Sequence, residues 1–159
     1  MKRSINILNK IGSLIPGYNG YEVRSDKRNS DKIFRDHNSF LISKSETSIV
    51  EFQKVLLADN KIPLIKDWEL VRKKLNTLTS ILKHSNYGES SFFAMNQIKE
   101  LELDQIMEFD ERIFDRVQLI FKTCHVDLEE SLSAILIMNC IKEIEGVLIE
   151  RSTYICKFK

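Results

Sequence analysis

Apolar residues recur at intervals of three and four along almost the whole chain, and no segment reads convincingly as a strand. This spacing is typical of amphipathic helices, which bury one apolar stripe. It predicts five helices, over residues 3–14, 25–58, 63–85, 99–124 and 128–156. The last four would each be roughly 35–50 Å long at 1.5 Å per residue. Short connections between long helices favour antiparallel neighbours, so we expect an all-α, up-down-up-down four-helix bundle with an additional short N-terminal helix.

Proline and capping residues set several of these boundaries. Pro16 is expected to end the first helix, because the residue before a proline avoids helical backbone angles. Pro63 suits the first turn of the third helix, where its missing N–H is not needed. Asp127 followed by Glu130 is a variant of the capping box and predicts that the last helix begins at residue 128.

The apolar stripes predict which side chains form the core. In the helix 25–58 the stripe repeats every seven residues at Phe34, Leu41, Ser48 and Val55. Ser45 and Phe52 lie between these positions. In the helix 63–85 it consists of Trp68, Val71, Leu75, Leu78 and Leu82. In the helix 99–124 it consists of Leu103, Ile106, Phe109, Ile113, Val117, Ile120 and Cys124. In the helix 128–156 it consists of Leu132, Ile135, Ile137, Ile141, Ile144, Leu148 and Ile155.

Composition excludes several classes of protein. The chain has 159 residues, of which 43% are apolar and 30% charged, with a formal net charge of +1, so disorder is not expected. The length suits one domain over residues 1–159, with residues 1–15 as its short amphipathic N-terminal helix. The sequence contains no run of about 18 or more apolar residues, the length that is needed to span a bilayer. The odd count of three cysteines fits reduced thiols, so we expect a cytoplasmic protein.

Charge is distributed unevenly along the near-neutral chain. Residues 1–35 contain eight basic and three acidic residues, whereas residues 89–118 contain eight acidic and three basic ones. One interpretation is internal complementarity, in which the basic N-terminal part lies near the acidic fourth helix. The other is a two-faced surface that meets a charged partner.

The expected topology brings two irregular segments, 16–24 and 86–95, to the same end of the bundle. Together with the helix that follows the first segment, they carry the candidate partner-binding residues Tyr18, Tyr21, Arg24, Arg28, Arg35, Tyr87, Phe92 and Phe93. Aromatic and arginine side chains are common anchors in protein interfaces. The alternative interpretation is that the aromatic rings close the open end of the core and the arginines pair with Asp31, Glu89 and nearby acids.

Two blocks of sequence resemble a family of small bacterial helical proteins with a proline-glycine-tyrosine loop before a helix bearing basic pairs. The first block is Ile15-Pro16-Gly17-Tyr18-Asn19-Gly20-Tyr21, Lys27-Arg28 and Asp31-Lys32-Ile33-Phe34-Arg35-Asp36-His37; the second is Tyr87-Gly88, Phe92-Phe93-Ala94 and Glu108-Phe109-Asp110. The close resemblance covers about 40 residues. Val23 and Ser25 depart from it, since charged residues are expected there, which weakens the basic surface. The resemblance implies a bacterial, intracellular helical protein and no established activity, so it supplies no catalytic residue.

The sequence offers little catalytic chemistry. A di-iron bundle needs Glu-x-x-His pairs, and none occurs, while His37, His84 and His125 are far apart, so we expect neither a metal nor another cofactor. Cys124 beside His125 is the candidate nucleophile, but neighbouring side chains on a helix point about 100° apart. The acidic residues at 108, 110, 111 and 115 are interpreted as a solvated helix face, because Arg112 and Arg116 lie among them.

The leading functional hypothesis is a non-enzymatic adaptor or scaffold that binds a protein partner through the aromatic and arginine-rich end or a helix groove. The alternative is a peripheral membrane protein, with Lys2, Arg3 and Lys10 of the N-terminal helix binding an anionic surface weakly. An enzyme with its site at the glycine- and tyrosine-rich end is a third possibility. A nucleic-acid partner is disfavoured by the sequence pI of 7.7. The sequence leaves the partner's identity and the oligomeric state open.

Overall fold

A computed structural model describes residues 2–21, 27–84, 99–126, 128–129 and 131–158. These residues form five helices: α1 (Lys2–Gly12), α2 (Lys27–Ala58), α3 (Ile62–Lys83), α5 (Glu100–Val126) and α6 (Leu132–Cys156). The predicted all-α fold, with four long helices and a short N-terminal one, is confirmed.

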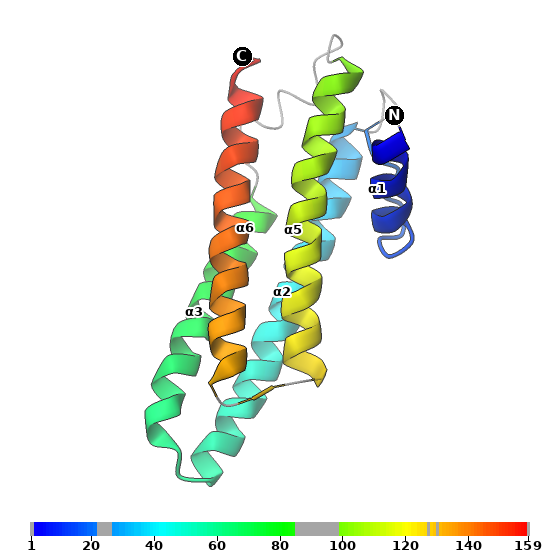
Figure 1. Ribbon diagram of the computed structural model, residues 1–159. Coiled ribbons are helices and arrows are strands. Elements are labelled where there is room, and N and C mark those ends of the chain that lie inside the picture. Colours follow the sequence, from blue (N-terminus) through cyan, green and yellow to red (C-terminus); the bar gives the residue numbers. More distant parts are fainter. Residues whose placement is uncertain (1, 22–26, 85–98, 127, 130, 159) are drawn as a thin grey trace.

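The four long helices form two antiparallel pairs, α2 with α3 and α5 with α6 (Figure 1). The pairs lie against each other so that α2 packs on α5 and α3 packs on α6, with each helix parallel to its partner in the other pair. Consequently α3 and α5 occupy opposite corners of the bundle although they are consecutive in the chain. The short helix α1 packs on the outer side of α5.

Local hydrogen bonds explain where the helices begin and end. Asn60 has a positive φ of 59°, and the Lys61 N–H bonds the Leu56 carbonyl at 2.8 Å, which turns the chain sharply between α2 and α3. At the start of α5 the Glu102 carboxylate accepts a 2.8 Å bond from the Lys99 N–H, as in one half of a capping box. The helix α6 begins at Leu132, four residues later than predicted, and the predicted capping residues 127 and 130 lie outside the described residues.

The predicted core stripes are confirmed in full on α3 and α5, where every named side chain is buried. On α2 the seven-residue stripe is wrong in its second half, because Ile42, Ile49 and Leu56 are buried while Val55 is 54% exposed and Ser48 half-buried. A straight α-helix drifts by about 20° per heptad relative to a seven-residue repeat, so the predicted series leaves the buried face progressively.

On α6 the predicted stripe is wrong at its first two positions, since Leu132 and Ile135 are exposed. The other members are buried apart from Leu148, which is partly buried against the core. This helix carries apolar residues around most of its circumference, so apolarity alone does not identify its inward face. Among the described helices, none has a stretch long and apolar enough to cross a bilayer.

Candidate functional site

A buried arginine lies at the centre of the most polar part of the core. Arg151 of α6 is 3% exposed, and its Nη2 donates a 2.6 Å hydrogen bond to Asp31 Oδ1 of α2. Its Nε donates a 3.0 Å bond to Asp110 Oδ1 of α5. One side chain therefore connects α6 both to its neighbour α5 and to the diagonally placed α2.

Each aspartate also accepts a hydrogen bond from a second side chain. Asp31 Oδ2 accepts a 2.8 Å bond from Arg35 Nε, one helical turn along α2. Arg35 Nη1 then donates a 3.1 Å bond to the Lys83 carbonyl, which lies in the last turn of α3 and lacks a helical partner. Asp110 Oδ2 accepts a 2.5 Å bond from the Tyr21 hydroxyl. The network thus reaches all four long helices and the turn before α2.

The turn that carries the two tyrosines depends on its glycines. Gly17 and Gly20 have φ values of 84° and 63°, in the left-handed region that favours glycine. A Cβ at Gly20 would also lie 3.0 Å from Leu8 Cδ1 of α1. The turn places the Tyr18 and Tyr21 rings edge to face, with centroids 6.3 Å apart. Among the described residues the buried Tyr18 hydroxyl has no hydrogen bond of normal geometry.

Burial raises the pKa values of Asp110 and of the two tyrosines. Desolvation raises the pKa of Asp110 to about 6, although Arg151 and the Tyr21 hydroxyl oppose the shift. Burial, and then the Asp110 charge, raise the pKa of both tyrosines well above the ordinary value. Both hydroxyls therefore stay protonated at neutral pH, and Asp110 is the member of this group that changes charge near neutrality.

A cavity of about 460 Å³ borders the network between α2, the end of α3 and α6. Its lining combines aliphatic and aromatic side chains with two guanidinium groups, and includes Phe34, Arg35, Ile81, Leu82, Leu148 and Arg151. Concave apolar pockets with a few convergent polar groups are where small molecules usually bind proteins.

The structure revises the predicted aromatic and arginine-rich surface. Tyr18 and Tyr21 are buried, so they do not form the exposed surface predicted for them, because their rings pack at the end of the core as the alternative interpretation proposed. Arg35 is mostly buried and pairs with Asp31, again as in that alternative. Arg28 is exposed. The other candidates, Arg24, Tyr87, Phe92 and Phe93, lie outside the described residues.

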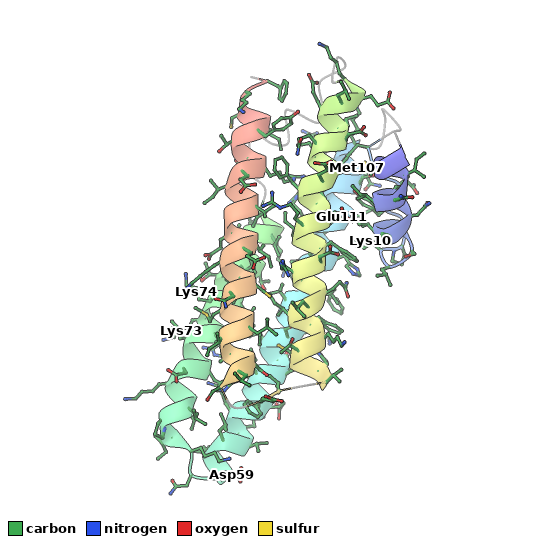
Figure 2. The ribbon with its side chains drawn as sticks, in the orientation of Figure 1. Lys10, Asp59, Lys73, Lys74, Met107 and Glu111 are labelled. Carbon is green, nitrogen blue, oxygen red and sulfur yellow. The ribbon has the colours of Figure 1, made fainter. Side chains whose placement is uncertain are left out.

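The N-terminal helix uses its apolar side for packing. Ile7 and Ile11 are buried, as is Ile15 beyond the helix, and α1 lies along α5. Lys10 Nζ donates hydrogen bonds to Glu111 at 3.0 Å and to Asp115 at 2.8 Å, and Figure 2 shows Lys10 and Glu111 facing each other. The predicted complementarity between the basic N-terminal part and the acidic helix is confirmed at these residues. The side chains of Lys2 and Arg3 lie outside the described set.

The adjacent cysteine and histidine at the end of α5 do not form a nucleophile and base. Burial raises the pKa of the Cys124 thiol to about 12, and its hydrogen bond with Ser45 only partly offsets this. The exposed His125 ring is 2.8 Å from the Phe121 carbonyl through Nδ1 and 3.2 Å from Ser48 Oγ through Nε2. Within the described ranges, no three His, Cys, Asp or Glu side chains converge to hold a metal ion.

Asp110 and Arg151 were not identified as site residues from the sequence, and Asp31 was named there only as a partner for the arginines. Asp110 is buried, so its assignment to a solvated acidic face is wrong; it lies four residues after Ile106 and three before Ile113, on the inward stripe. Arg151 lies four residues from both Val147 and Ile155, on the inward stripe of α6. In both cases the signal was a charged residue at a core position.

The network and the cavity place paired charged groups beside apolar walls. The network supplies charged donors and acceptors that are already paired, and the cavity supplies apolar walls beside two guanidinium groups. Its titrating carboxylate, Asp110, is held by an arginine and a tyrosine instead of facing open solvent. Comparisons with models of protein families, with curated proteins and with solved structures find no match for this chain.

Proposed function

We propose that the protein is a non-enzymatic helical-bundle interaction protein that binds a protein partner in the groove between α3 and α6. The observation that carries this proposal is a pair of exposed apolar side chains on opposite sides of the groove, Leu70 of α3 and Ile135 of α6, which are 54% and 60% exposed. The groove has a volume of about 350 Å³ and is floored by the buried residues Val71 and Ala134.

The same two helices carry further exposed apolar side chains and two charges. Ile62 and Leu132, at the starts of the same two helices, are also exposed. Asp67 of α3 and Lys142 of α6 line the groove and add one charge of each sign. Contiguous apolar surface bordered by charge is typical of protein interaction sites. A partner segment with an apolar helical face, read at spacings of three and four residues, suits such a groove.

Membrane docking by α1 is less well supported. It requires an exposed apolar face, but Ile7 and Ile11 lie in the core, and Lys10 is engaged by two carboxylates. If α1 were the docking element, anionic vesicles would retain the wild-type protein at low salt and release a variant with Lys10→Glu. Failure of the wild type to sediment with such vesicles argues against this alternative.

The proposal is tested by site-specific photo-crosslinking in lysate of the native host. A benzoylphenylalanine residue at position 70 reports on the groove, and one at Phe40, which is similarly exposed on α2, serves as the matched control. We expect a heterologous crosslinked protein from position 70 only, and we expect Ile135→Glu to abolish it. Circular dichroism must show that each variant is folded.

Three outcomes overturn the proposal. Products that form equally from positions 70 and 40 show that the groove is not specific. Absence of any product from position 70 shows that no partner in the lysate uses the groove. A product that contains two copies of this chain assigns the groove to self-association instead of a heterologous partner.

A further inference from the structure

We propose that the cavity beside Arg35 binds a small amphipathic carboxylate, with the aliphatic tail between α3 and α6 and the carboxylate on the Arg35 guanidinium. This site is distinct from the groove at Leu70 and Ile135. Both lie between the parallel helices α3 and α6, but the groove is near the start of these helices and the cavity is near their other end.

The walls of the cavity determine the tail of the ligand. They are formed mainly by aliphatic side chains, Ile81 and Leu82 of α3 and Leu148 and Ile149 of α6, with the Phe34 ring of α2. A volume of about 460 Å³ lies within the range of ordinary small-molecule pockets. An unbranched aliphatic chain fits these walls because they offer it apolar contact along its length.

The donors of Arg35 determine the head group. Its Nε and Nη1 are occupied by Asp31 and by the Lys83 carbonyl, but Nη2 forms no hydrogen bond to any residue that the structure describes. A guanidinium has a rigid set of N–H donors that suits a carboxylate. The hydroxyl-bearing residues Ser152 and Thr153 also line the cavity and can supply a second donor.

Negative charges near the cavity are already compensated. Asp31 pairs with both Arg35 and Arg151, and the Asp110 carboxylate pairs with Arg151. Glu145, which lines the cavity, lies 3.7 Å from the Lys74 ammonium of α3. A carboxylate that enters the cavity therefore meets the Arg35 side chain in the lining and no unpaired acid among the described lining residues.

Calorimetric titration of the full chain with sodium octanoate tests this inference, with octanol as the uncharged control. We expect saturable octanoate binding and at least tenfold weaker binding of octanol. Each methylene removed from the tail should weaken binding about fourfold, so hexanoate should bind about fifteenfold more weakly than octanoate.

Two variants with matched exposure locate the site. Ile149→Glu places a carboxylate at the wall of the cavity on a side chain that is 68% exposed, so the fold should tolerate it. Ile135→Glu makes the same change on the same helix, at the groove. We expect octanoate binding to weaken at least tenfold with Ile149→Glu and to stay unchanged with Ile135→Glu. Arg35→Met should also abolish the preference for octanoate over octanol.

Several results overturn the inference. Absence of saturable octanoate binding, or equal binding of octanol, contradicts the carboxylate site. Equal effects of the two glutamate variants place the binding elsewhere. Because the crosslinking experiment depends on Ile135 and this titration depends on Ile149, failure of one proposal is distinguishable from failure of the other.

Discussion

Replacing Arg151 with methionine tests whether the buried network stabilises the bundle. Methionine keeps much of the aliphatic length of arginine but removes the donors to Asp31 and Asp110, at 2.6 and 3.0 Å. Among the described residues, Asp31 keeps Arg35 as a partner and Asp110 keeps the hydroxyl of Tyr21. The variant therefore leaves an ionisable carboxyl in the core without a cation.

The magnitude follows from the burial of both partners. Removing one member of a buried ion pair typically destabilises a protein by about 3–5 kcal/mol. Since small proteins have a total free energy of unfolding of about 5–15 kcal/mol, Arg151→Met should remove a large part of it. In a chain of this size, 4 kcal/mol lowers the melting temperature by roughly 8–16 °C. Asp110→Asn on this background removes the ionisable carboxyl but keeps an oxygen for Tyr21, so it should restore about 1–3 kcal/mol.

Urea unfolding at pH 7.5, followed by circular dichroism at 222 nm, measures these differences. The matched control is Arg112→Met, which breaks an ion pair to Glu150 whose two members are about half exposed. Such surface pairs contribute about 0–1 kcal/mol. The reasoning is refuted if Arg151→Met destabilises the protein no more than Arg112→Met does. It is also refuted if Asp110→Asn lowers the stability of the Arg151→Met variant further.

Three further predictions concern titration, the tyrosine hydroxyl and the thiols. The pKa of Asp110 is 3.8 when exposed and about 6 in the fold, so the folded state binds more protons between these values. Stability should fall as pH rises through this window, by on the order of 3 kcal/mol, and a pH series should show no such contribution in Asp110→Asn. Tyr21→Phe removes a bond to a charged group and should lower the unfolding free energy by about 1.5–3 kcal/mol in urea melts. Exposed Cys156 should react with a thiol reagent in the native protein, while Cys124 should react only on unfolding, as peptide mass spectrometry would show.

The buried face is predictable from the sequence on α3 and α5 and less so on α2 and α6, for a physical reason. On α3 and α5 polar and charged residues together occupy most positions away from the stripe, so one face is clearly apolar and every predicted core residue is buried. On α2 the polar centre leaves few apolar residues to define the face, and a strict seven-residue series moves from buried Phe34 to exposed Val55. On α6 the apolar residues at 132 and 135 lie outside the core because the helix offers more than one apolar face.

The candidate site was harder to predict because its residues are remote from one another in the chain. Asp110 and Arg151 each stand at inward positions of their helices, and this was visible in the sequence, but the acidic neighbours of Asp110 favoured a solvated interpretation. The pairing of Arg151 with Asp31 depends on the order of helices around the bundle, in which α2 and α6 are diagonal. Helix periodicity carries no information about that order. A charged residue on a core stripe is predicted to be buried, but the residue with which it pairs is determined by how the helices pack.

The buried network also joins residues from distant segments of the sequence. Segments 15–37 and 108–110 contain Tyr21, Asp31, Arg35 and Asp110, and these residues meet in one hydrogen-bonded group around Arg151, which lies outside those segments. The same group supplies the guanidinium side of the cavity. A change in these segments should therefore alter stability and octanoate binding together, whereas Ile149→Glu should alter binding alone. If Tyr21→Phe lowers stability but leaves octanoate affinity unchanged, the network acts on the fold alone and the cavity is shaped by α3 and α6 without it.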